Sequence, residues 1–434
     1  MAVQKGSPWL SLLNRERIPI PITANESTDT VVIGGGIAGL STAFYLLHDT
    51  DREVVLLEAN LVAHGATGHS AGSVVASMEK SYNELIQNLD EECVAQGYRE
   101  LRSGWHLLEE ILEKIGQKNI FHRVKGMTFV DSQKMISSMI EEADRRAAIW
   151  GEKVEVVIIS NTSANIGGTR EVESEQLVPP FNLKNKGYTA AMCVPAGVLN
   201  AALFTNIIAD YLLDEYPDRF HLYEKSRVRR LRLGDEIAAT VDRNTVFADN
   251  AVLCTNGYIG MEIESCEVPV SVGNIKAKIG FMSGWYDNES PASASFFKEH
   301  EKSYYYVTNH PYSEHSLTTL GGPEKDLASG EQYNPQKIYD VDAYNRLDIF
   351  GRETLDDYSR DMEWHGLMGY VTDGIRLVGP DPNNPNLMYN LGCNGIGILA
   401  SLAGGWKVAQ QMCGITLPQS MFDPCRLANI DQSD

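Results

Sequence analysis

Three glycines near the N-terminus have the spacing of a dinucleotide-binding turn. The sequence Gly34-Gly35-Gly36-Ile37-Ala38-Gly39 follows the β-branched run Thr30–Ile33 and precedes apolar residues at helical spacing. Gly34 permits the tight turn, Gly36 lets backbone N–H groups approach a pyrophosphate, and Gly39 allows a helix to pack closely. The N-terminus of that helix then faces the anion. The six-residue pattern alone is weak, but its place between a strand and a helix predicts dinucleotide binding.

An acidic residue stands where a ribose partner is expected. Val54–Leu57 is a short apolar run typical of a buried strand, and Glu58 follows it, nineteen residues beyond Gly39. A carboxylate at this position accepts hydrogen bonds from ribose hydroxyls. The segment therefore predicts a strand, helix and strand unit with a parallel pair of strands. NAD and FAD sites share these features, so these residues leave the choice of dinucleotide open.

The composition is that of a large globular protein. The chain has 434 residues, 43% of them hydrophobic, which is enough for two interleaved domains. Asp and Glu number 58 against 37 Lys and Arg, a net charge of -21, so the protein's field repels phosphate backbones and anionic lipids. We therefore expect no nucleic acid partner.

Cysteine usage and hydropathy indicate the compartment. The 7 cysteines are scattered, without a CxxC pair or Cys/His ligand spacing, so we expect reduced thiols and no metal. The N-terminal residues do not have the pattern of a signal peptide, and the most apolar late stretch, Leu391–Trp406, is too short to span a bilayer. A cytoplasmic protein without a membrane span is expected.

Hydrophobic periodicity predicts the elements that position these residues. Helices are expected at Leu40–Leu47, in a helical excursion over 84–150, at Val198–Leu213 and at Ile398–Met412. A strand is expected at Val246–Cys254, and a half-exposed antiparallel sheet from Val268–Trp285 and Ser303–Leu320.

Four further segments contain small residues in recognisable patterns. They are His64-Gly65-Ala66-Thr67-Gly68-His69-Ser70-Ala71-Gly72, Thr255-Asn256-Gly257-Tyr258, Gly366–Pro382 and Leu391–Ile398. The first resembles the isoalloxazine-facing loop of the flavoprotein superfamily that contains D-amino-acid oxidase, glycine oxidase and sarcosine oxidase. The other three occur in that family's order, and Leu320–Pro323 supports the middle of the chain. The resemblance thus runs from about Asp29 to Cys413.

This resemblance implies an α/β fold in which a Rossmann-type FAD-binding domain is interleaved with an α+β substrate domain built on an antiparallel sheet. We expect the FAD-binding domain to comprise residues 25–90, 190–260 and 365–420, and the substrate-binding domain to comprise 91–189 and 261–364. Val228, in the expected strand Ser226–Leu231, resembles the family position whose backbone touches the adenine. The residues expected to bind FAD are Gly34, Gly36, Ile37, Ala38, Gly39, Glu58, Ala66, Thr67, Gly68, His69, Ser70, Ala71, Val228, Thr255, Asn256, Gly257, Gly392, Asn394, Gly395, Ile396 and Gly397.

The glycine-rich loop 392–397 has properties that a reduced flavin needs. Gly392, Gly395 and Gly397 admit close approach, and the helix predicted after them directs its positive end toward the negative charge that develops at flavin N1 and C2=O. Close packing of the loop is the alternative interpretation. The density of glycine in so short a segment favours the flavin role.

The chemistry implied by the resemblance is oxidation of a C–N bond in an amine or amino acid. A neutral amine gives hydride from its α-carbon to flavin N5, and the imine hydrolyses. Positioning and exclusion of water do not require a dedicated catalytic side chain, so the only candidates are His69, Met368, Tyr258 and His365. The alternatives are flavin-dependent oxidation of a 2-hydroxy acid, and a non-catalytic scaffold that FAD stabilises.

Two departures from the family pattern concern the substrate. Glycine oxidase-like members place an Arg in W-x-G-L-R to hold a substrate carboxylate, whereas this chain has Met368 there. Monomeric sarcosine oxidases use a Lys where this chain has Leu399. Either the substrate is an amine without an α-carboxylate, or another cation takes over, the candidates being Lys276, Lys278 and Arg376. The acidic charge balance slightly favours a cationic amine.

Flavin attachment and the electron acceptor are the other departures. His69 matches a His that is bonded to the flavin in dimethylglycine and sarcosine dehydrogenases, but most relatives bind FAD non-covalently, so covalent attachment is not favoured. Thr319 corresponds approximately to the oxygen-activating Lys of sarcosine oxidases. The acceptor is therefore left open between oxygen and an electron carrier.

Aromatic residues and histidines of the expected sheet are candidates for the substrate cavity. Alternation places Tyr304 and Tyr306 on one face of a strand and Tyr305 on the other. His310 and His365 belong to the same segments. Tyrosines in strands and single histidines more often serve packing, so these residues stay outside the expected FAD site.

Overall fold

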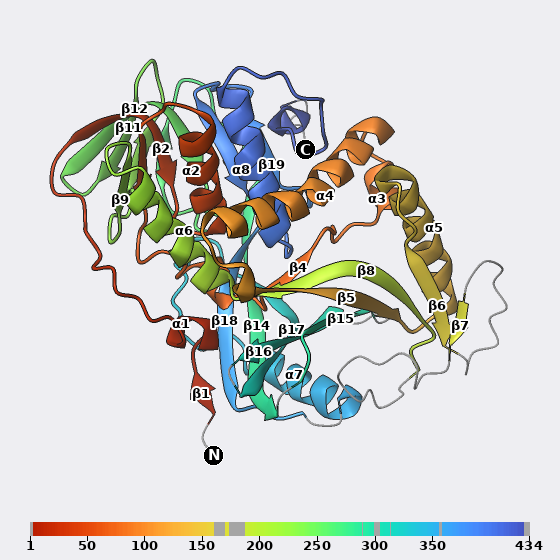
Figure 1. Cartoon of the computed structure of the whole chain (residues 1–434). Coiled ribbons are helices and arrows are strands. Elements are labelled where there is room, and N and C mark those ends of the chain that lie inside the picture. Colours follow the sequence, from red (N-terminus) through yellow and green to blue (C-terminus); the bar gives the residue numbers. More distant parts are fainter. Residues whose placement is uncertain are drawn as a thin grey trace.

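Two mixed β-sheets with helices packed against them form the protein (Figure 1). The computed structural model describes residues 3–159, 170–172, 187–288, 290–298, 304–312, 314–355 and 358–428. Among these residues, no helix has the length and the apolar composition needed to cross a bilayer.

The smaller sheet carries the predicted strand, helix and strand unit. β2 (Glu26–Ile33) runs parallel to β3 (Val54–Leu57), as predicted, and parallel to β12 (Asn244–Leu253) on its other side. The sheet order is β13-β10-β11-β12-β2-β3-β9, and β20 also pairs with β12 and β19. The remaining strands are β9 (Phe220–Tyr223), β10 (Arg230–Arg232), β11 (Ile237–Val241), β13 (Glu262–Glu264), β19 (Leu377–Pro380) and β20 (Leu387–Leu391).

The larger sheet contains the predicted antiparallel strands. β14 (Ile275–Asn288) and β16 (Tyr304–Tyr312) both pair antiparallel with β17 (His315–Asp326), which confirms the antiparallel pairing. The expected half-exposure is wrong, because residues 307–310 and 316–321 are buried on both faces of the sheet. The order is β1-β18-β14-β17-β16-β15-β5-β8-β6-β7, with β4 paired to β8. The other strands are β1 (Gln4–Lys5), β4 (Ser73–Val75), β5 (Phe121–Val130), β6 (Glu155–Ile159), β7 (Arg170–Val172), β8 (Ala190–Leu199), β15 (Ser293–Lys298) and β18 (Met362–Val371).

The helices pack their apolar faces against the sheets. α2 (Ile37–Asp49) and α8 (Ile398–Met412) cross closely beside the smaller sheet (Figure 1), because Gly405 has no side chain to meet the backbone of Ser41 and Thr42. The bounds of α8 are those predicted. The other helices are α1 (Pro8–Ser11), α3 (Tyr82–Leu85), α4 (Glu91–Lys114), α5 (Gln133–Trp150), α6 (Ala201–Glu215) and α7 (Val341–Thr354), with 3₁₀ turns at Ala66–His69, Lys118–Ile120 and Pro424–Leu427.

Two expectations of local structure are corrected. The helical excursion 84–150 is interrupted by β5, because Phe121–Val130 pairs with β8 and β15 and buries its second half. The strand expected at Ser226–Leu231 is shorter, and Val228 precedes it. β8 and β18, which begin in the ranges 190–260 and near 365 expected for the FAD-binding domain, pair within the larger sheet.

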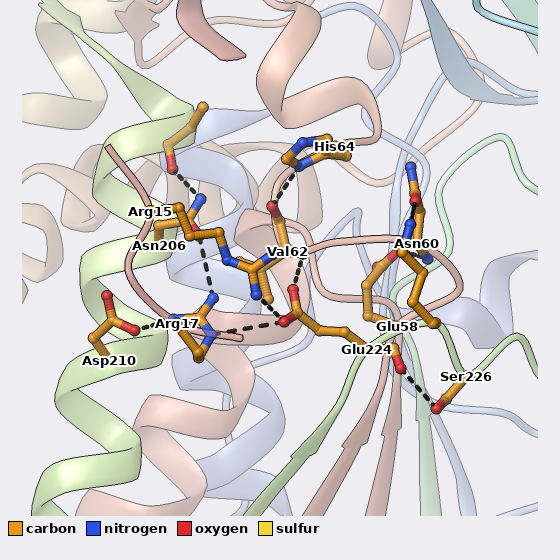
Figure 2. A network of polar contacts seen from close by, with 12 residues as sticks. Arg15, Arg17, Glu58, Asn60, Val62, His64, Asn206, Asp210, Glu224 and Ser226 are labelled. Atoms are coloured by element: carbon orange, nitrogen blue, oxygen red, sulfur yellow. Dashed lines mark hydrogen bonds and ion pairs between the residues drawn. The ribbon is translucent and has the colours of Figure 1, made fainter. Parts of the chain in front are cut away.

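A buried carboxylate ties the N-terminal segment to the smaller sheet (Figure 2). Glu224 follows β9 with 1% of its surface exposed, and its carboxylate accepts from the backbone N–H of Val62 at 2.6 Å. Arg15 forms an ion pair with the same carboxylate, and the Nε of Arg17 lies 3.7 Å from it. Glu224 thereby holds the start of the loop that leads to residues 64–72.

We expect Glu224→Gln to lower the free energy of unfolding by about 3 kcal/mol, because it leaves the largely buried guanidinium of Arg15 without its counter-charge. Urea unfolding with saturating cofactor measures this. Asp210→Asn is the matched control, since Asp210 also pairs with Arg17 but its side chain is 55% exposed, and we expect a loss below about 1 kcal/mol. Equal losses in the two variants would contradict the role assigned to Glu224.

Candidate active site

A large cavity takes its lining from both sheets. Its volume is about 1970 Å³, and it extends from the carboxyl ends of β2, β3 and β12 to side chains of β14, β16 and β18. A cavity of this size, walled by glycine-rich turns at one end and by polar and aromatic side chains at the other, accommodates a dinucleotide together with a small molecule.

The first glycine turn is built from backbone contacts that exclude any side chain. Gly34 has φ +113°, and a Cβ there would lie 2.7 Å from the carbonyl oxygen of Cys254. A Cβ on Gly39 would lie 1.8 Å from the carbonyl oxygen of Gly34. Gly36 precedes α2, which has no side-chain cap and no acidic residue in its first turn. The turn therefore leaves a positive helix end open to the cavity.

Glu58 lines the cavity next to this turn. Its two carboxylate oxygens accept from the backbone N–H groups of Gly35 at 2.6 Å and Asn60 at 2.7 Å. Desolvation raises the pKa of Glu58 in spite of these bonds. The carboxylate is thus held in place by backbone, and each oxygen keeps a lone pair for a further donor.

The loop 64–72 is fixed by residues from the N-terminus. Ser7 donates to the carbonyl of Gly68 at 2.5 Å, and the indole N–H of Trp9 donates to the carbonyl of Ser70 at 2.8 Å. Gly68 packs so closely on Leu10 that a Cβ would lie 2.5 Å from its side chain. The sequence carries no signal for these contacts, because the two segments lie about sixty residues apart.

His69 lines the cavity as a neutral imidazole. Its Nδ1–H donates to the carbonyl of Gly65 at 2.7 Å, which leaves Nε2 with a free lone pair. Burial lowers the pKa of His69 to about 4. Its backbone is held by Trp364, whose indole N–H donates to the His69 carbonyl at 3.0 Å.

Two asparagines with positive φ join the later segments to one another. Asn256, with φ +50°, accepts through its side chain from the N–H groups of Gly369 at 3.1 Å and Cys393 at 3.0 Å. Asn394, with φ +44°, accepts from the N–H of Val371 at 2.9 Å. These bonds position the loop 392–397 against the end of β18.

The residues expected to bind FAD divide into two groups. Gly39, Gly68 and Asn394 do not line the cavity and instead shape its walls. The others line it, namely Gly34, Gly36, Ile37, Ala38, Glu58, Ala66, Thr67, His69, Ser70, Ala71, Val228, Thr255, Asn256, Gly257, Gly392, Gly395, Ile396 and Gly397.

The candidate catalytic residues divide in the same way. Met368 and Tyr258 line the cavity with His69. His365 does not, because Tyr333 donates to its Nδ1 at 2.9 Å and its Nε2–H donates to the carbonyl of Lys337 at 2.9 Å. Its ring has a structural role in joining β18 to the segment before α7.

The candidate substrate residues follow the alternation of the strand. Tyr304 and Tyr306 line the cavity, whereas Tyr305 stacks on Phe350 with ring centroids 4.0 Å apart. His310 bonds to the carbonyl of Ala71 at 2.9 Å and does not line the cavity.

The structure also places the residues found where relatives have a lysine, and the cations weighed as replacements. Leu399 is fully buried against Gly104, and the hydroxyl of Thr319 lies 2.8 Å from that of Thr308. Among the cations proposed as replacements, Lys276 and Arg376 line the cavity and Lys278 does not.

An acidic pair that the sequence did not indicate faces the cavity beside the loop 392–397. The hydroxyl of Tyr370 lies 2.8 Å from Oε1 of Glu79 and 2.6 Å from Oε1 of Glu324. Gly395 approaches this pair so closely that a Cβ would lie 2.4 Å from the same oxygen of Glu79. No motif marks these residues, because they lie in three separate segments of the chain.

The protonation of this pair follows from its geometry. Tyr370 has one proton and can donate to only one of the two carboxylates, so the second contact is a hydrogen bond only when a carboxyl holds a proton. Desolvation and the charge of Glu324 raise the pKa of Glu79 to about 7. The ammonium of Lys278 lies 3.5 Å from the other oxygen of Glu324. Near neutral pH, Glu79 can therefore take or release a proton.

Comparison with curated proteins finds distant relatives. Gamma-glutamylputrescine oxidoreductase of Escherichia coli K12 is 21% identical over 244 residues, which are 56% of this chain and 52% of that protein. The chain thus matches about half the length of this relative.

Solved structures match over nearly the whole chain. Glycine oxidase from Geobacillus kaustophilus has a TM-score of 0.69 at 15% identity, covering 92% of this chain and 98% of that one. L-proline dehydrogenase from P. horikoshii has a TM-score of 0.69 at 16% identity, covering 93% and 98%. This likeness is one of fold, and it confirms the predicted fold class.

The family comparison covers the same region. The model described as DAO, FAD dependent oxidoreductase, matches residues 29–411, which include every residue that lines the cavity and all strands except β1 and the start of β2. The resemblance inferred from the glycine-rich segments is thereby confirmed. The chain belongs to the DAO family of FAD-dependent oxidoreductases.

Proposed function

We propose that this protein oxidises the C–N bond of a cationic amine that lacks an α-carboxylate, with FAD bound by the cavity residues named above. The observation that carries the choice of substrate is the acidic pair, Glu79 and Glu324, that shares Tyr370 beside the loop 392–397. An ammonium group is the natural partner of two carboxylates.

The residues present fit FAD. The turn at Gly34–Gly39 is a cradle that a Cβ would fill, Glu58 retains acceptor capacity, and α2 and α8 both begin without an acidic residue in their first turns. Such a turn accepts a pyrophosphate, and such a carboxylate accepts a ribose hydroxyl. When bound, the flavin supplies the hydride acceptor for the oxidation.

The protein's own residues bind the amine and control its proton. Glu79 and Glu324 hold the ammonium form as it enters, and Glu79, with its pKa of about 7, accepts the proton that must leave before the neutral amine can react. Met368 and Tyr306 line the same cavity and would limit the access of bulk water to the reacting carbon. The imine product then hydrolyses in water.

The same charges argue against the alternatives. A 2-hydroxy acid or an α-amino acid brings a carboxylate, which Glu79 and Glu324 repel. At the two positions where relatives hold a carboxylate with a cation, this chain has the uncharged Met368 and Leu399. A non-catalytic scaffold does not require the carboxyl groups of Glu79 and Glu324 to face the cavity.

Flavin reduction tests the proposed reaction. We expect anaerobic incubation with a panel of primary and secondary alkylamines and diamines to bleach the visible flavin absorption, with release of ammonia or an amine in air or with an artificial acceptor. Glycine, sarcosine and 2-hydroxy acids serve as controls and should leave the spectrum unchanged. Bleaching by 2-hydroxy acids alone would show that the protein oxidises a hydroxy acid and not an amine. No bleaching by any compound would indicate a non-catalytic scaffold that FAD stabilises.

The pH profile tests Glu79. Glu79 faces Glu324, Tyr370, Lys278 and Lys298, and its raised pKa means that the carboxylate form exists above about pH 7. We expect kcat/KM for the amine to rise with pH through about 7, and Glu79→Gln to lower it by about 10- to 150-fold and to remove that limb of the profile.

Glu331→Gln is the matched control for this variant, because Glu331 also lines the cavity but pairs with exposed Lys337. It should change kcat/KM by less than about 2-fold. An unaltered pH limb in Glu79→Gln would show that Glu79 is not the group that titrates.

Acid precipitation tests the attachment of FAD. We propose that FAD is dissociable and that neutral His69 is its neighbour, held by Gly65. The yellow colour should then enter the supernatant when the protein is precipitated with acid. Colour that stays with the wild-type pellet and leaves it in His69→Ala would instead identify His69 as a covalent tether.

A further inference from the structure

Arg376 is a buried cation without a counter-ion at the wall of the cavity. It lies just before β19 with 4% of its surface exposed, and it lines the cavity. Its Nη2 donates to the side-chain oxygen of Asn390, while Nε and Nη1 have no hydrogen-bond partner in the part of the chain that the structure describes. No described carboxylate forms an ion pair with it. Its titratable neighbours are the thiols of Cys254 and Cys393, and burial raises the pKa of both thiols, so they carry no compensating charge at neutral pH.

This arrangement is unfavourable in the protein alone. Burial lowers the pKa of Arg376 to about 10, so the guanidinium is charged at neutral pH in spite of its surroundings. A buried charge is normally compensated by a partner of opposite sign. The missing compensation points to a negative group that is absent from the polypeptide.

Two helix ends add to the positive charge at the same wall. Asn390, which holds Arg376, donates to the carbonyl of Ala38 at 3.2 Å and to that of Ser401 at 2.9 Å. Ala38 belongs to the first turn of α2 and Ser401 to the first turn of α8, and neither turn contains an acidic residue. The guanidinium and the positive ends of both helices therefore surround one region of the cavity.

We propose that Arg376 supplies the counter-charge for the pyrophosphate of the bound dinucleotide. The tie through Asn390 leads to Ala38, inside the turn Gly34–Gly39, which is the place that a pyrophosphate takes in such turns. Arg376 acts through its charge and through Asn390, and it is therefore not available as the substrate's carboxylate anchor. This role depends on FAD binding but not on the amine proposed as substrate.

Binding of the cofactor and of a fragment without the flavin tests the proposal. Apoprotein of wild type, Arg376→Gln and Arg376→Lys is titrated with FAD and with ADP-ribose, which has the pyrophosphate but no isoalloxazine. We expect Arg376→Gln to weaken both ligands by at least about 10-fold and Arg376→Lys to weaken them less, because it keeps the charge. Added salt should reduce the difference in affinity for both ligands between wild type and Arg376→Gln.

Lys276→Gln is the matched control, since Lys276 is a cation that lines the same cavity without a tie to Asn390. Its affinity for both ligands should stay within about 2-fold of wild type. Circular dichroism of each variant checks the fold, and if Arg376→Gln does not fold, the charge-retaining Arg376→Lys carries the comparison with Arg376→Met.

Two results would overturn the proposal. One is unchanged affinity of Arg376→Gln for ADP-ribose together with weaker FAD binding, because the charge would then act on the flavin ring. The other is unchanged affinity for both ligands. Weaker binding of both ligands in a protein that oxidises no amine would uphold the role of Arg376 and refute the proposed function instead.

Discussion

Close approach of backbone segments at the carboxyl ends of β2, β12 and β20 is the constraint on which the site depends. The carbonyl of Cys254 lies where a side chain on Gly34 would be, and the carbonyl of Gly34 lies where a side chain on Gly39 would be. Gly405 lets α8 cross α2 at backbone distance. Because these contacts leave no room for side chains, the two helix ends and the strand ends meet at one wall of the cavity.

A few side-chain hydrogen bonds, together with the backbone bond from Asn394 to Gly369, couple the second sheet to this wall. Asn256 and Asn394 bond the end of β18 to the loop 392–397, and Trp364 bonds β18 to the loop that carries His69. Each bond joins segments that are distant in the chain. The polar groups that face the substrate thus keep a defined position relative to the cofactor turn, which is the requirement for a reaction that depends on orientation.

The charged groups at two walls of the cavity differ in sign. Arg376 and the ends of α2 and α8 place positive charge at one wall, whereas the carboxyl groups of Glu79 and Glu324, with Lys278 beside Glu324, lie at the wall beside Gly395. The diphosphate of FAD complements the first wall, and the ammonium group of the proposed substrate complements the second. Desolvation and then the charge of Glu324 raise the pKa of Glu79, although the hydrogen bond from Tyr370 opposes this rise.

The sequence by itself determined the features that depend on local spacing. The glycine turn, the parallel pair around it, the position of Glu58 and the bounds of α8 could be predicted, because each reflects a short pattern of backbone freedom or periodicity. The family could be inferred for the same reason, since its segments are glycine-rich and ordered along the chain. The alternation of Tyr304, Tyr305 and Tyr306 was equally local.

Only the tertiary structure decided which distant residues meet. Glu79, Glu324 and Tyr370 become one site because β18, β17 and the segment after β4 converge on the cavity, and no residue type at any fixed spacing indicates this. Long-range packing likewise decided that the ring of His365 bonds to Tyr333 and Lys337 and that the side chain of Leu399 is buried against α4. Charge compensation is a property of spatial neighbours, so the missing partner of Arg376 could be recognised only in three dimensions.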